Sequence, residues 1–241
     1  MARERLRKFR AAFSGAERPA IELYSLDVAL AAGLQTLLAV TEVVMREAMN
    51  KQLTQMLGPR WFDQQGWFDY RTKGDILRAK TYLGGPRAAS HAPPGKVVAA
   101  LSFGAWVGLL ARGSAPVKNS GLPPIDYTAT LWDPCLAAAF PQWASDRAQL
   151  EALAGRVRSV RNRVAHHEPI VFGVPVHGVL PGNRQVRLRP ATAIAAVLSL
   201  LASVCEVTAA ELRSVTGIWT LLQHPHLAVA EGVLQASSIF E

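Results

Sequence analysis

The longest regular pattern in this chain is helical and runs from residue 19 to about residue 57. Leu30, Leu34 and Leu37 recur at the three- and four-residue spacing that places apolar side chains on one face of an α-helix. The pattern ends at Gly58-Pro59, because neither residue extends a helix well. A segment of this length and period predicts one long helix.

Shorter helical patterns follow along the chain. We predict further helices over residues 73–83, 96–110, 131–139, 145–167, 190–212 and 219–240. Stretches rich in Gly, Pro and Ser predict loops at 84–95 and 113–129. Valine-rich segments on either side of Pro181-Gly182-Asn183 suggest a loose hairpin within residues 170–189. The expected fold class is therefore all-α, with at most one short β-hairpin.

The N-terminus differs from the rest in composition. Residues 1–18 carry six basic and two acidic residues and little periodic pattern, which predicts a mobile or partly helical basic arm. No repeat and no boundary of composition appears after it. We therefore expect one domain over residues 19–241.

The charge of the chain favours polyanionic partners. Lys and Arg number 26 against 18 Asp and Glu, a formal net charge of +8, and such a surface suits nucleic acid or an anionic membrane. The two most apolar segments, 28–40 and 191–207, are short or interrupted by polar residues, so we interpret them as core helices and expect no membrane partner.

Cysteine usage bears on metal binding and on compartment. Cys135 and Cys205 are the two cysteines, and neither has zinc-ligand spacing to another cysteine or to a histidine, so we expect no metal and no cofactor. No apolar signal-peptide segment follows the basic N-terminus, which favours a cytoplasmic protein.

The helix predicted over 145–167 has a clear apolar stripe, whose members step by three, four, three and four residues. These members are Leu150, Leu153, Val157, Val160 and Val164. At 100° per residue, the polar residues of its last two turns fall on the remaining face. That face points to solvent, a groove or a second copy of the helix.

The last two turns carry a concentrated polar set, Arg-Asn-Arg-Val-Ala-His-His-Glu-Pro over residues 161–169. Arginine holds a phosphate in a planar fork, and histidine exchanges protons near neutral pH. RNA supplies its own nucleophile, the 2′-hydroxyl. A base and a cation held close together are therefore a minimal set for cutting RNA without a metal.

This motif resembles the signature of HEPN-domain proteins of the abortive-infection (Abi-like) type, in which an arginine and a polar residue are followed after a few spacers by a histidine. Other stretches resemble the same family in the expected order, so that the resemblance spans about residues 21–172. They are residues 42–48, 58–62, 95–106 (with Lys-Val-Val and Leu-Ser-Phe-Gly-Ala-Trp), 131–132 and 139–141.

The resemblance implies an all-α, HEPN-like helical bundle with extra helices, and commonly a homodimer that brings two motif helices together. It implies a metal-independent endoribonuclease of a phage-defence (abortive-infection) or toxin system. An antitoxin or another defence-system protein is then a candidate partner. Some members of the family have lost catalysis.

We assign three residues to catalysis. His166 is the general base or acid, and Arg161 clamps the phosphate and stabilises the transition state. Asn162 holds His166 or a phosphate oxygen. Cleavage would leave a 2′,3′-cyclic phosphate.

Other residues are given supporting roles. His167 falls near the apolar stripe and is expected to be a partly buried histidine, with the runner-up claim to catalysis, and Glu168 orients an imidazole or caps the turn. Glu42 and Arg46 are spaced for an i,i+4 ion pair beside the motif. The RNA-binding residues are expected to include two further arginines of this helix, Arg158 and Arg163.

Two alternatives to the nuclease remain open. One is a non-catalytic HEPN module that binds RNA or a protein through the same groove. The other is a scaffold protein whose basic face meets an acidic partner. The nuclease and the RNA-binding module both predict an affinity for RNA that falls steeply with salt. Only the nuclease predicts metal-free cleavage that depends on His166.

Overall fold

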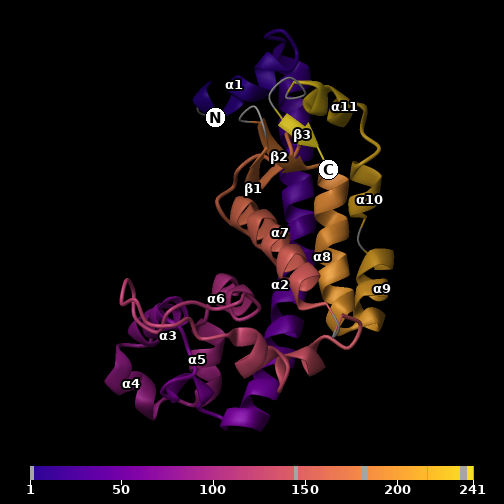
Figure 1. Cartoon of the computed structure of the whole chain (residues 1–241). Coiled ribbons are helices and arrows are strands. Elements are labelled where there is room, and N and C mark those ends of the chain that lie inside the picture. The colour runs from indigo at the N-terminus through magenta and orange to yellow at the C-terminus, as the bar shows by residue number, and fades with distance from the viewer. Residues whose placement is uncertain (1–2, 144–145, 181–183, 216, 234–237, 241) are drawn as a thin grey trace. The chain divides into compact units, whose positions relative to one another are not determined.

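The structure is a computed structural model that describes residues 3–143, 146–180, 184–215, 217–233 and 238–240, and it is mostly helical (Figure 1). The chain divides into two compact units, each described by itself. The first comprises Met1–Thr41, Ser159–Ser199 and Val207–Glu241, and the second comprises Glu42–Arg158 and Leu200–Glu206. The mostly helical character predicted from the periodicity is confirmed.

The long helix is present as α2 (Glu17–Leu57). Leu30, Leu34 and Leu37, which define the predicted apolar face, are fully buried. By length and composition α2 could also cross a membrane, a property that it shares with core helices of soluble proteins. Gly33 lies where Ile218 approaches, since a Cβ at this position would come within 2.8 Å of the Ile218 side chain.

The basic arm is helical over α1 (Arg3–Ala11), and it packs on the core of the first unit. Leu6 and Phe9 are buried, and the Phe9 ring lies 5.3 Å from the Tyr24 ring and 5.1 Å from the Phe172 ring. Of the two alternatives for this segment, the partly helical one is therefore correct. The assignment of 19–241 to a single domain stays a prediction.

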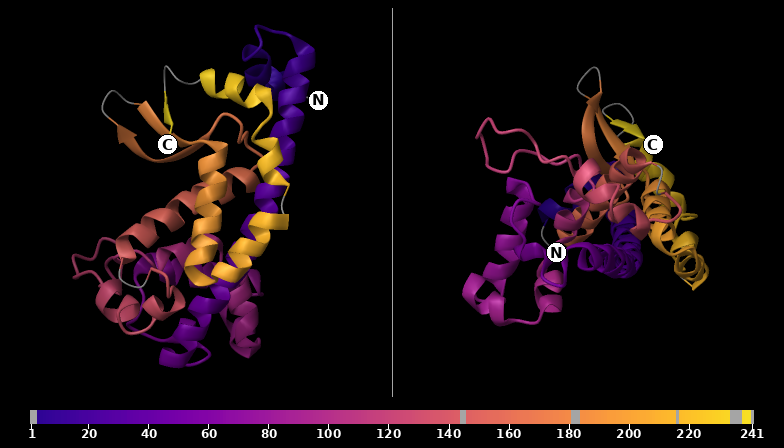
Figure 2. Two further views of the ribbon diagram at one scale, coloured as in Figure 1. Left: turned by 90° about the vertical axis from the view of Figure 1, so that its right-hand side faces the viewer. Right: turned by 60° about the horizontal axis from the view of Figure 1, so that its bottom comes forward.

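The predicted hairpin is confirmed within the first unit. Strands β1 (Val174–Leu180) and β2 (Arg184–Leu188) pair antiparallel, and Figure 2 shows them from two further sides. The expectation of at most one hairpin holds for the described residues, and β3 (Ser238–Phe240) is an unpredicted third strand that pairs parallel with β2.

The helices predicted over 190–212 and 219–240 are both too long. The chain instead forms α8, α9, α10, α11 and β3, with the helices at Pro190–Val204, Glu206–Val215, Ile218–Leu221 and Pro225–Gly232. Pro225 has no backbone N–H to continue α10, and it begins α11 as a first-turn proline. The tail after α11 contributes a strand, which local periodicity did not signal.

The second unit is built from short helical segments around aromatic side chains. Trp61 contacts Phe68 and Trp106 edge-on, with ring centroids 5.7 Å apart in both pairs. The segments are η1 (Trp61–Asp63), α3 (Tyr70–Tyr82), α4 (Pro86–His91), α5 (Pro94–Ala100), α6 (Phe103–Gly108), the π-helical η2 (Thr128–Trp132) and the 3-10 helix η3 (Leu136–Ala139).

Three predictions for this unit are corrected. The loop at 84–95 contains α4, which Pro86 starts in its first turn. The single helix over 96–110 is two helices, because Ser102 begins a new one by accepting a hydrogen bond from the Ala105 N–H at 3.2 Å. The helix over 131–139 is divided between η2 and η3.

Candidate active site at the end of α7

The motif lies at the C-terminal end of α7 (Arg147–Ala165). Four members of the predicted stripe are buried, and Ala154 joins them, whereas Leu153 is half-buried. The buried members are Leu150, Val157, Val160 and Val164. The stripe therefore sets the rotation of α7 as the sequence predicts, and it leaves Asn162, Ala165 and His166 exposed.

The helix ends two residues before the predicted position, in a left-handed turn. His167 has φ +53°, and its N–H donates to the Val164 carbonyl at 3.0 Å, while the Glu168 N–H donates to the Arg163 carbonyl at 2.9 Å. This pair of hydrogen bonds is the Schellman arrangement, usually built on glycine. The prediction that His167 is partly buried is wrong: it is exposed, because the turn takes it off the helical wheel.

Arg163 fastens this turn to the helix. Its Nε donates to the Pro169 carbonyl at 2.6 Å, and its Nη1 lies 2.9 Å from a Glu168 carboxylate oxygen. The side chain is 11% exposed. Burial lowers the pKa of Arg163, and the carboxylates of Glu168 and Asp27 counteract this. This geometry supports a structural role for Arg163 and Glu168, in addition to the predicted RNA-binding and capping roles.

Asp27 of α2 holds the chain that follows the turn. One of its oxygens, Oδ1, accepts hydrogen bonds from the backbone N–H groups of Ile170 (2.6 Å) and Val171 (2.9 Å). The residue is 6% exposed, and burial raises the pKa of its carboxyl against the opposing effect of the two hydrogen bonds. Sequence reasoning missed Asp27, although an acidic residue within an apolar helical stripe is itself a signal, since buried carboxylates need partners.

The catalytic candidates Asn162 and His166 share a hollow of about 190 Å³. Its other lining residues include Ser159, Arg163 and Glu168. In the described part of the chain no side-chain hydrogen bond joins Asn162 to His166; the link between them is the backbone bond from the His166 N–H to the Asn162 carbonyl at 3.0 Å. The exposed His166 imidazole and the Asn162 amide beside it can bind a polar ligand in this hollow.

Arg161 is half-buried and is not among the residues that line this hollow. The structure of one chain therefore brings together Asn162, His166 and Glu168, and leaves the predicted phosphate clamp outside the hollow. A helical separation of five residues accounts for this, because it turns two side chains about 140° apart.

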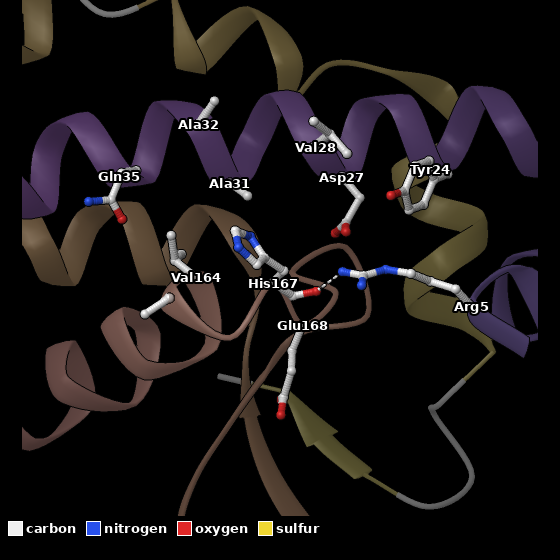
Figure 3. A pocket seen from close by; sticks show the side chains of 11 residues that line it. Arg5, Tyr24, Asp27, Val28, Ala31, Ala32, Gln35, Val164, His167 and Glu168 are labelled. Atoms are coloured by element: carbon white, nitrogen blue, oxygen red, sulfur yellow. Dashed lines mark hydrogen bonds between the residues drawn. The ribbon is translucent and has the colours of Figure 1, made fainter. Parts of the chain in front are cut away.

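A larger cavity, of about 710 Å³, is also lined by residues of this turn (Figure 3). Its polar lining includes Arg5, Asp27 and His167, and Arg5 donates a hydrogen bond to the His167 carbonyl. Glu168 lines both this cavity and the smaller hollow. Two depressions of the first unit thus share Glu168 of this turn as a lining residue.

Cations gather around the same turn. Burial, followed by the nearby guanidinium groups of Arg187 and Arg163, lowers the pKa of Lys8. Arg187 donates to the carbonyls of Phe172 (3.3 Å) and Gly173 (2.9 Å), and the Lys8 Nζ lies 5.8 Å from the Phe172 ring centroid. Positive charge concentrated in this way attracts phosphate groups.

The remaining predicted residues belong to the second unit. The Nε of Arg46 lies 3.5 Å from a Glu47 carboxylate oxygen, and Arg158 is half-buried near Gly104. The i,i+4 pair of Glu42 with Arg46, and their placement beside the motif, stay predictions.

Comparison with known proteins adds no identification. No protein-family model, no curated protein and no solved structure matches this chain. Within the described ranges, no three His, Cys, Asp or Glu side chains lie close enough together to hold a metal ion. The geometry at the end of α7 is therefore the ground on which a function has to be argued.

Proposed function

We propose that this protein is a metal-independent endoribonuclease of the HEPN, abortive-infection type, acting in phage defence or as a toxin. The observation that carries the proposal is the shared hollow of Asn162 and His166, two exposed polar side chains at the end of a helix whose rotation is set by its buried stripe. The net charge of +8 and the cations around the turn favour RNA as the polyanion.

The proposed reaction needs one proton acceptor, one cation and one proton donor. His166 takes the proton of the RNA 2′-hydroxyl, and the 2′-oxygen then attacks the adjacent phosphorus. The bond to the 5′-oxygen breaks, and that oxygen takes a proton from an imidazolium. The products are a 2′,3′-cyclic phosphate and a 5′-hydroxyl.

A homodimer completes this arrangement. Two copies of α7 facing each other supply two histidines, so that the partner's His166 serves as the acid when the first serves as the base. Arg161, which lies outside the hollow of its own chain, serves the phosphate held between the copies. Its guanidinium stabilises the charge that develops on the phosphate oxygens.

The test is cleavage of labelled RNA in the presence of EDTA. We expect the parent protein to produce 2′,3′-cyclic phosphate ends. His166→Ala should lose about 10²–10⁴-fold in rate, because it removes the proton-transfer group. Arg161→Lys should also be slow, since an ammonium cannot reproduce the guanidinium fork.

The matched control is His91→Ala, which removes an exposed imidazole on α4 that hydrogen-bonds the Arg87 carbonyl at 2.9 Å. It should cleave at the parental rate, and circular dichroism should show that all variants fold. Normal cleavage by His166→Ala together with an inactive His167→Ala would transfer the role to His167. Absence of cleavage by the parent, with salt-sensitive RNA binding retained, would leave the non-catalytic binding module.

A further inference from the structure

The larger cavity of the first unit is not used by the cleavage step. It is bounded by α2 on one side and by the turn 167–168 on the other, and Arg5 reaches it from α1 (Figure 3). Its volume of about 710 Å³ lies in the range of pockets that hold nucleotide-sized ligands.

The walls of this cavity are largely apolar. They are formed by short side chains of α2 and by the end of α7, and these short side chains leave a broad surface. The apolar lining consists of Val28, Ala31, Ala32, Val164 and Ala165. His167 lines the same cavity, and Figure 3 shows its ring on the side of the turn that faces α2, so an aromatic edge borders the same surface. A flat ring is the ligand shape that such walls favour.

Asp27 supplies a hydrogen-bond acceptor inside this apolar surface. Its Oδ1 is occupied by two backbone N–H groups, whereas its Oδ2 accepts no hydrogen bond from the described residues. Figure 3 shows the carboxyl group directed away from α2, toward the space beside Arg5. Asp27 therefore offers the cavity one carboxylate oxygen, Oδ2, that can accept a hydrogen bond from a ligand.

We propose that this cavity is a nucleobase subsite for RNA, which selects adenine and cytosine through their exocyclic amino group. The proposal rests on the proposed function, because it assigns part of the RNA substrate to the neighbouring cavity. The amino group of the base donates to Asp27 Oδ2, and the ring of the base lies on the apolar walls. Arg5 donates to a phosphate through those guanidinium N–H groups that are not bonded to the His167 carbonyl.

Uracil is disfavoured because it places an oxo oxygen where adenine and cytosine place the amino group, and a carboxylate repels that oxygen. Guanine is disfavoured for a different reason. Its ring N–H and amino group point in the same direction, and only one of these two donors can be paired at Oδ2, because Oδ1 already accepts from Ile170 and Val171.

The experiment measures binding of mononucleotides to the full chain by calorimetry, near pH 8, because burial raises the pKa of Asp27 and the subsite requires the carboxylate. Two pairs isolate the amino group: AMP against IMP, and CMP against UMP. We expect the amino member of each pair to bind about tenfold more tightly, the effect of one hydrogen bond to a charged group.

Asp27→Asn tests the direction of the hydrogen bond. The amide oxygen can still accept from Ile170 and Val171, while the amide nitrogen now offers a donor to the cavity. We expect the preference to reverse, so that IMP binds more tightly than AMP. Equal binding of AMP and IMP by the parent, or an unchanged preference in Asp27→Asn, would overturn the proposal.

A second variant tests the location without altering Asp27. Ala32→Phe fills the cavity from an exposed position of α2 and should abolish binding of both AMP and IMP. Ala39→Phe makes the same change at an exposed position of α2 outside the cavity and should leave binding intact. Equal effects of the two variants would contradict the assigned site.

The outcomes separate this subsite from the nuclease. Amino-selective binding by a parent that cleaves no RNA would retain the subsite and reject the nuclease. RNA cleavage without any difference between AMP and IMP would reject the subsite alone. Binding of mononucleotides and cleavage of RNA are separate measurements on the same preparation, and each can succeed when the other fails.

Discussion

At the scale of single residues, the turn after α7 is held by a hydrogen bond and an ion pair within the same segment of the chain. Arg163 bonds the Pro169 carbonyl and pairs with Glu168, while His167 occupies a left-handed position without being glycine. A left-handed conformation costs an L-residue about 1–2 kcal/mol. Such strain at a surface turn is commonly retained where the side chain has a use, and His167 borders the proposed nucleobase subsite.

The strain at His167 makes a prediction about stability. His167→Gly removes the cost of φ +53°, although glycine adds about 0.4–1 kcal/mol of unfolded-state entropy. We expect a net gain of about 0.5 kcal/mol in the free energy of unfolding, measured by urea denaturation. His167→Ala keeps the strain and should stay near the parent, since the ring is exposed. A glycine variant less stable than the alanine variant would show that the turn carries no strain.

At the scale of elements, Asp27 joins α2 to the segment after α7. Two backbone N–H groups depend on one carboxylate oxygen, so the chain at 170–171 follows α2 closely. Both depressions are formed by elements of the first unit, and Glu168 lines each of them. Their shapes therefore depend on the same turn.

The raised pKa of Asp27 predicts how stability changes with pH. The folded state binds the proton more tightly than the unfolded state does, so this contribution is present below the unfolded value of 3.8 and is lost as pH rises through the folded pKa. Asp27→Asn does not titrate. We expect the stability of the parent relative to Asp27→Asn to be lower near pH 8 than near pH 4, measured by thermal or urea unfolding.

Glu4→Gln is the control for this measurement, because its carboxylate is 77% exposed. Its stability relative to the parent should change little over the same interval. A relative stability of the parent that rises with pH at position 27 would mean that the folded state lowers the pKa of Asp27, contrary to the effect of burial.

At the scale of the whole molecule, the proposed nuclease requires two chains. Asn162, Ala165 and His166 are exposed on the face opposite the buried stripe of α7, a concentrated polar set beside a small residue. A second copy of α7 can approach closely at Ala165. The symmetric pairing of identical surfaces is the commonest form of protein oligomer.

We expect a homodimer through this face. Light scattering at tens of micromolar, on the order of 10⁻⁵ M, should give a mass of twice the 26.1 kDa of one chain. Ala165→Arg should shift the mass toward one chain, because it places a charge and bulk at the contact. Ala39→Arg, on an exposed part of α2, should leave the dimer intact. A monomer at this concentration for the parent would contradict the two-histidine mechanism.

What the sequence by itself determined is the local structure of the long regular elements. The apolar period of α2 placed its start within two residues, and Gly58-Pro59 predicted its end at about Leu57. The stripe of α7 predicted that Asn162 and His166 are exposed, but it failed for His167, which lies beyond the end of the helix. Such features depend on residues three and four positions apart, which a single sequence displays.

The tertiary structure alone decided the contacts that build the site. Asp27 and Ile170 are 143 residues apart, and nothing local to either predicts that one oxygen serves two N–H groups. The separation of Arg161 from the hollow, the partners of Arg163 and the pairing of β3 with β2 are of the same kind. These contacts arise from chain segments that meet only on folding, where burial forces each polar group to find a partner.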